Sequence, residues 1–150
     1  MEKGIKISKK VQAIIYDIKE EKPYFLILHR ILRWKGWELL KGTLEDGEED
    51  NITKALEREI KEETNLKDFK IEKSLNKKII FYNKERTVKN IILDVFIVRA
   101  DIEQKISLHK NSVIEHDDYK WVDKETAIKM LTFDNAKELI KNLKDKRKDF

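Results

Sequence analysis

The chain has 150 residues, of which 40% are hydrophobic and 41% charged, and its formal net charge is +4. This length predicts one domain, residues 1–150, with a substantial buried core. Residues 141–148 contain five basic residues and one acidic residue, which accounts for the net charge and argues against a broad nucleic-acid-binding surface. Cysteine is absent, which excludes a disulfide framework and a thiolate metal site.

Nothing in the sequence indicates export or insertion into a membrane. The first ten residues lack the apolar centre of a signal peptide, and no apolar run approaches the length of a membrane span. We therefore expect a cytoplasmic protein, a monomer or homodimer, with no membrane partner and no stable nucleic-acid partner.

Two hydrophobic runs near the start predict an antiparallel pair of strands. Residues 11–16 are a β-branched run typical of a buried strand, a charged turn follows at 19–23, and residues 24–30 predict the returning strand. Two tryptophans come next, Trp34 and Trp37, and we favour a position in the core for Trp37.

The following segment predicts a helix over residues 51–64. Asp50 and Asn51 are residue types that cap helix N-termini, and apolar residues then recur at helical spacing as far as Ile60. Asn65 suits the left-handed backbone conformation that ends many helices.

Three glutamates of this helix lie where a carboxylate is costly. A helix turns by roughly 100° per residue, which places Glu59 and Glu63 inside the apolar arc and Glu62 at its flank. The three carboxylates are three and four positions apart, so they repel one another. A divalent cation such as magnesium, which prefers oxygen ligands, would remove that repulsion. A charged helix whose last turn emerges into water is the alternative, and the residues alone leave both interpretations open.

The rest of the chain predicts further strands and then helices. Strands are expected over 69–74, 78–82 and 87–98, a loop over 101–111, a short strand over 119–122, a helix over 124–131 capped by Asp123, and a final helix capped by Asp134. This order predicts an α/β (α+β) fold in which a mixed sheet has helices on both faces.

The segment from Gly42 to Leu66 resembles the Nudix signature, in which a glycine, a glutamate and an Arg-Glu-X-X-Glu-Glu core follow at fixed spacing. The core is intact here and begins at Arg58. Asn65 replaces a glycine of the signature, which is a mild change because Asn also adopts the left-handed conformation.

A second departure concerns the loop before the helix. Two extra residues separate Glu48 from Arg58, so the signature leaves open whether Glu48 or Asp50 is the acidic partner of Arg58.

The resemblance implies a Nudix α/β/α sandwich and a pyrophosphohydrolase, dependent on Mg²⁺ or Mn²⁺, for nucleoside diphosphates linked to another group. Transferred by position, it makes Glu59, Glu62 and Glu63 catalytic metal ligands and adds the carbonyl oxygen of Gly42. It gives Arg58 the role of fixing the preceding loop.

Residues 115–121 resemble the Glu-His-X-X-Tyr-X-Trp pattern of the diadenosine tetraphosphate (asymmetrical) hydrolase branch. This resemblance implies that Glu115 is a further catalytic and metal-binding glutamate, with Glu103 as the alternative. His116 is suited to acid–base catalysis by its ordinary pKa, although a lone loop histidine more often has a structural role.

The same branch stacks adenine between two aromatic side chains. Tyr82 and Phe133 stand at matching places in this chain, and a core position for Phe133 is an equal alternative. Lys41, Lys84 and Arg86 are the nearest candidates for contacts with a polyphosphate.

The implied reaction is hydrolysis of dinucleoside polyphosphates such as diadenosine tetraphosphate to ATP and AMP. Alternative substrates for the same chemistry are ADP-ribose, damaged nucleoside triphosphates and RNA 5′-triphosphate ends. A nucleotide- or RNA-binding module without catalysis is an alternative of another class. The basic C-terminal residues and the lengthened loop favour that module, and the intact glutamate core argues against it.

Overall fold

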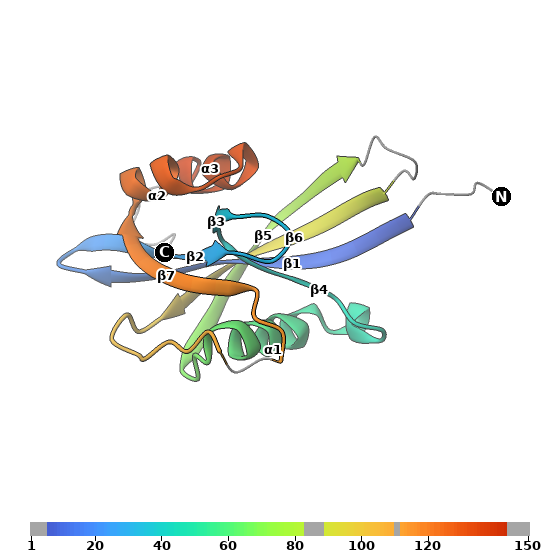
Figure 1. Ribbon diagram of the computed structural model, residues 1–150, viewed down its shortest axis with the longest axis horizontal. Coiled ribbons are helices and arrows are strands. Elements are labelled where there is room, and N and C mark those ends of the chain that lie inside the picture. Colours follow the sequence, from blue (N-terminus) through green and yellow to red (C-terminus); the bar gives the residue numbers. More distant parts are fainter. Residues whose placement is uncertain (1–5, 83–88, 110–111, 144–150) are drawn as a thin grey trace.

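A computed structural model of the chain describes residues 6–82, 89–109 and 112–143. A mixed seven-stranded β-sheet has helices on both of its faces (Figure 1). The strands are β1 (Lys6–Lys19), β2 (Lys22–Arg30), β3 (Gly36–Glu38), β4 (Leu40–Thr43), β5 (Phe69–Tyr82), β6 (Lys89–Ala100) and β7 (His116–Asp123). The helices are the short 3₁₀ helix η1 (Glu48–Asp50), α1 (Ile52–Thr64), α2 (Lys124–Met130) and α3 (Asp134–Lys141). The predicted α/β/α sandwich is confirmed.

Strands β1 and β2 separate along part of their length, and the short strands β3 and β4 pair with them there. The strand order is β3-β2-β1-β6-β5, with β4 paired to β1 and β7 paired to β2. Strand β1 pairs with β2 over residues 16–19 but with β4 over residues 10–13, and β2 pairs with β3 over residues 28–30. The segment from β3 to β4 therefore fills the gap where β1 and β2 separate, and it places Glu38 and Lys41 at the middle of the sheet.

Strands are longer in the structure than their hydrophobic runs predict. The parallel pairing of β1 with β6 starts at Lys6 and continues through several polar residues, because backbone groups pair whatever the side chains are. The two strands predicted over 69–74 and 78–82 are one strand, β5, whose register shifts between Ser74 and Lys78. The expected antiparallel pair of β1 and β2 is confirmed.

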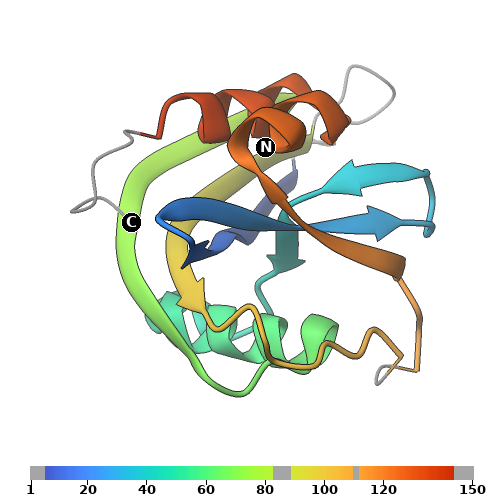
Figure 2. The ribbon, with the colours of Figure 1, turned by 90° about the vertical axis from the view of Figure 1, so that its left-hand side faces the viewer.

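Side chains alternate between the two faces of β1 and so contribute to two separate cores. Val11, Ala13 and Ile15 belong to the core under α1, whereas Ile14 and Tyr16 belong to the core under α2 and α3. Figure 2 shows α2 and α3 above the sheet and α1 below it. Each face of the sheet therefore has its own helix layer.

The helix ends follow the predicted capping with one correction. Asn51 caps α1 by accepting from the Lys54 N–H, and Asn65 ends that helix with φ 61°. Asp123 caps α2 as predicted. Asp134 does not cap α3: it is the first helical residue, where its charge favours the positive end of the helix dipole without a capping hydrogen bond. None of the described helices is both long and apolar enough to span a membrane.

Candidate functional site

Arg58 joins the loop before α1 to the helix. Its Nε and Nη2 donate to the two carboxylate oxygens of Glu48, each over 2.8 Å. These hydrogen bonds are the main reason that the pKa of Glu48 falls to about 2. Asp50 is exposed in η1. The structure therefore pairs Arg58 with Glu48, and η1 accommodates the lengthened loop.

Arg58 also contacts two of the signature glutamates. Its Nη1 lies 3.0 Å from Oε1 of Glu59 and 2.9 Å from Oε2 of Glu62. Glu59 and Glu63 are buried while Glu62 is exposed, as the helical periodicity predicts. Burial is the main cause that raises the pKa of Glu59 to about 7; the charge of Arg58 opposes the rise, and the charges of Glu62 and Glu115 add to it. Glu59 is therefore a carboxylate that titrates near neutral pH.

Gly42 in β4 lies directly against the carboxylate of Glu59. A Cβ at position 42 would collide with the carboxylate carbon and Oε2 of Glu59. Any other residue here would force the Glu59 side chain to move, because that side chain occupies the space of a Cβ at position 42. The close approach brings the backbone of Gly42 next to a signature glutamate.

A cleft of about 320 Å³ contains the predicted acidic residues and several basic ones. We call it the acidic cleft; its lining residues are Lys10, Arg30, Arg33, Lys41, Gly42, Thr43, Leu44, Glu45, Arg58, Glu59, Glu62, Glu63 and Glu115. Glu115 lies just before β7, and its Oε1 is 3.4 Å from Nη2 of Arg30. Glu103 instead lies in the loop after β6, where it pairs with exposed Lys19 over 3.7 Å. Of the two candidates, Glu115 is the one in the acidic cleft.

A buried charge network lies beside this cleft. Nη1 of Arg30 is 3.1 Å from Oε2 of Glu38, and Nε2 of His116 is 2.8 Å from the same oxygen. Burial alone would raise the pKa of Glu38, but the hydrogen bond with His116 and the positive charges of Lys41 and Arg30 hold it below its ordinary value. The ionised carboxylate only accepts hydrogen bonds, so His116 donates from Nε2. His116 thus has a structural partner, and Glu38 links Arg30 to the edge of β7.

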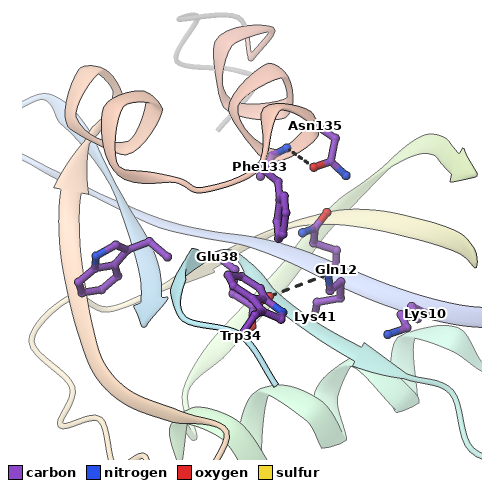
Figure 3. A pocket seen from close by; sticks show the side chains of 9 residues that line it. Lys10, Gln12, Trp34, Glu38, Lys41, Phe133 and Asn135 are labelled. Atoms are coloured by element: carbon purple, nitrogen blue, oxygen red, sulfur yellow. Dashed lines mark hydrogen bonds and ion pairs between the residues drawn. The ribbon is translucent and has the colours of Figure 1, made fainter. Parts of the chain in front are cut away.

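A second cleft, of about 370 Å³, lies on the opposite face of the sheet from α1 (Figure 3). We call it the aromatic cleft; its lining residues are Lys10, Gln12, Trp34, Trp37, Glu38, Lys41, Phe133, Asn135 and Ala136. Phe133 is 48% exposed and meets Trp34 edge to face, with ring centroids 4.8 Å apart. Phe133 therefore lies at a cleft mouth rather than in the core. Trp37 is partly buried and packs against the core, in line with the favoured expectation.

Sequence reasoning missed Trp34 as the aromatic neighbour of Phe133. The segments that hold the two rings are almost 100 residues apart in sequence, and they are held together where the Trp37 N–H donates to Oγ1 of Thr132 and the Thr132 N–H to the Trp37 carbonyl. No local pattern shows that contact. The expected partner, Tyr82, ends β5, but its side chain lies outside the described residues, as do Lys84 and Arg86.

The acidic cleft suits a divalent cation in the kind of groups that line it. Glu59, Glu62, Glu63 and Glu115 offer carboxylate oxygens in one cleft, and hard divalent cations such as Mg²⁺ prefer oxygen ligands. Within the described residues, no three acidic or histidine side chains already converge as a metal-binding group. Nη1 of Arg58 contacts both Glu59 and Glu62.

The fold agrees with the comparisons to known proteins. The family model described as NUDIX domain matches residues 8–143, and the chain belongs to the NUDIX family. No protein with curated function matches the chain.

Solved structures of the same fold share low sequence identity with this chain. An Ap4A hydrolase binary complex from C. elegans has TM-score 0.73 and 22% identity, over 89% of this chain and 93% of that one. A NUDIX hydrolase from Listeria monocytogenes has TM-score 0.68 and 25% identity, over 89% and 90% of the two chains. The MutT protein from Methanosarcina mazei has TM-score 0.67 and 22% identity, over 91% of each chain.

Proposed function

We propose that the protein is a divalent-metal-dependent pyrophosphohydrolase of dinucleoside polyphosphates, with diadenosine tetraphosphate cleaved to ATP and AMP. The observation that supports this most is the junction of the two clefts: Lys10 and Lys41 line both of them. A nucleotide with its base in the aromatic cleft would have its phosphates beside these lysines and its phosphoanhydride near the signature glutamates. The C. elegans Ap4A hydrolase fold similarity supports the choice of first substrate.

The aromatic cleft supplies the base-binding end. Trp34 and Phe133 offer two aromatic surfaces at its mouth. Stacking of a nucleobase on such rings contributes roughly 1–3 kcal/mol per base. Trp34 joins Phe133 as a proposed base-binding residue, and the role of Tyr82 stays a prediction because its side chain lies outside the described residues.

Basic residues at the junction would hold the polyphosphate. Lys41 keeps this predicted role, and Lys10, Arg30 and Arg33 join it in lining the acidic cleft. Arg30 is committed to Glu38 and Glu115, so it fixes the position of Glu115 as well as adding positive charge. The combination places fixed cations around a substrate that has several negative charges.

Glu59, Glu62, Glu63, Glu115 and the Gly42 carbonyl would hold Mg²⁺ or Mn²⁺. When bound, such an ion neutralises charge on phosphate oxygens and lowers the pKa of water. Arg58 holds the loop through Glu48 and so keeps β4 and α1 in place beside the substrate. Glu115 is the proposed acceptor of a proton from the attacking water, whose oxygen bonds to phosphorus as the bridging P–O bond breaks.

A second substrate class is favoured by the same cleft. Diadenosine tetraphosphate and ADP-ribose both have an adenosine group at one end. The NUDIX domain of Shewanella oneidensis NrtR, solved with ADP ribose, has TM-score 0.63 and 14% identity, over 89% of this chain and 83% of that one. ADP-ribose is therefore the alternative substrate.

A product assay separates these proposals. The protein is incubated with diadenosine tetraphosphate, ADP-ribose, nucleoside triphosphates or 5′-triphosphate RNA, with and without Mg²⁺, and the nucleotides are separated. ATP plus AMP from the first substrate, only with metal, is the expected result. Faster turnover of ADP-ribose would change the substrate, and binding of RNA without turnover of any compound would favour the non-catalytic module.

A further inference from the structure

A buried polar side chain at the floor of the aromatic cleft has no part in the chemistry proposed above. Gln12 lies in the central strand β1 and is only 4% exposed. Its Oε1 has no hydrogen-bond partner among the residues that the structure describes. Burying an amide oxygen without a partner costs stability. Its presence here is explained if a molecule from outside the chain supplies the missing donor.

The position of Gln12 is one where the strand would otherwise place an apolar residue. Alternate residues of β1 share a face, and Ile14 and Tyr16 on the face of Gln12 pack into the core under α2 and α3. Gln12 is the next residue of that row, and it stands opposite Lys41 of β4 in the strand register. At Gln12 the row therefore changes from residues packed in the core to a residue that lines the aromatic cleft.

The surroundings of Gln12 suit a flat ring with polar edges. Figure 3 shows its amide group pointing from the sheet toward Phe133 and Asn135. Trp34 and Phe133 form apolar walls of the same cleft, which measures about 370 Å³. Aromatic walls stack on the face of any base and so select weakly among bases. Selection therefore has to come from a group that reaches the edge of the ring.

We propose that Gln12 is a specificity-determining residue that selects a 6-aminopurine base. The amino group of the base donates to Oε1, and the ring nitrogen beside it accepts from Nε2. Carboxamide side chains make this two-bond pairing with adenine in nucleic-acid recognition, whereas guanine is usually bound by arginine or lysine. The assignment deepens the proposed function and rests on it for the nucleotide nature of the ligand.

Binding of two nucleotides that differ only in the donor tests the assignment. The probes are AMP and purine riboside 5′-monophosphate, which lacks the 6-amino group, titrated by calorimetry into metal-free protein. We expect AMP to bind about tenfold more tightly than the amino-free probe, since an unmade hydrogen bond leaves a buried acceptor unsatisfied. In Gln12→Met the ratio should fall to about one, with a melting temperature that is unchanged or higher.

A matched variant separates edge recognition from stacking. Phe133→Ala should weaken binding of both nucleotides and leave their ratio near its wild-type value. Equal affinities in the wild-type protein, as expected if only a buried water satisfies Gln12, would overturn the assignment. So would an unchanged ratio in Gln12→Met, or tighter binding of GMP than of AMP. If Gln12→Met does not fold, the ratio of the two affinities is measured in Gln12→Leu and compared with the ratio in the wild-type protein.

The outcome is independent of turnover. A ratio that depends on Gln12 in a protein that hydrolyses no polyphosphate would support this assignment and refute the proposed function. Hydrolysis of diadenosine tetraphosphate by a protein that binds both probes equally would support the proposed function and refute the assignment of Gln12.

Discussion

Glu59 should make the metal-free protein less stable as the pH rises. Its pKa is raised from 4.5 to about 7 in the folded chain, chiefly by burial. Between these two values the folded state holds a proton that the unfolded state has lost, so the free energy of unfolding decreases as pH rises through this window. Each tenfold change in proton affinity corresponds to about 1.4 kcal/mol, which gives an upper limit of about 3 kcal/mol by pH 8.

The substitution Glu59→Gln keeps the size of the side chain and removes its ionisation. It should raise the melting temperature at pH 8 by roughly 5–10 °C and have little effect at pH 5, since 1 kcal/mol corresponds to about 2–4 °C for a domain of this size. Thermal unfolding of the wild-type protein and Glu59→Gln in EDTA, from pH 5 to pH 8.5, measures this difference in melting temperature. Glu57→Gln is the matched control, because Glu57 lies on the exposed side of the same helix.

Equal pH dependence in wild-type protein and Glu59→Gln would refute the reasoning. It would mean that Arg58 and solvent already stabilise the ionised carboxylate, and that the inward position of Glu59 on α1 costs nothing. The argument for a cation beside this helix would then lose its electrostatic basis.

Three further substitutions test other parts of the site. Gly42→Ala places a methyl group against the Glu59 carboxylate, so we expect about 1–3 kcal/mol lower stability in denaturant unfolding together with loss of activity. A wild-type free energy of unfolding and wild-type activity would show that Glu59 has room to move. Phe133→Ala should raise KM for adenine substrates roughly 5- to 100-fold with little change in kcat, and unchanged steady-state kinetics would exclude Phe133 from base binding. Arg58→Lys cannot make the two-bond pair with Glu48, so both the melting temperature and kcat should fall, and a fully active variant would remove the loop-fixing role.

The fold and the acidic half of the site could be predicted because their signals are local. Helical periodicity places Glu59 and Glu63 inward from positions within a single helix, and Asn51 and Asn65 mark the ends of α1 by their own capping chemistry. The central parts of strands β1 and β6 follow from β-branched runs. The length of β5 could not be predicted, because its two hydrophobic runs are joined across a register shift between Ser74 and Lys78 that no local residue pattern records.

The aromatic half of the site depends on contacts between distant segments. Trp34 meets Phe133 only because β3 brings Trp37 against Thr132, and no spacing in the sequence records that approach. Gln12 is equally hidden: a single polar residue in a β-branched run indicates nothing until the cleft above it is known. The acidic partner of Arg58 was also open until the turn of η1 placed Glu48 beside it.

Metal binding in the acidic cleft is the claim on which the account depends most. Titration of Mn²⁺ into wild-type protein and into Glu62→Gln/Glu63→Gln, followed by electron paramagnetic resonance, measures it directly without any substrate. We expect saturable binding in the wild-type protein, strongly weakened in the double variant, whose fold is kept or stabilised and whose hydrolytic activity falls by several orders of magnitude. Absence of saturable binding in the wild-type protein, or a double variant that binds Mn²⁺ equally well and remains active, would contradict the account.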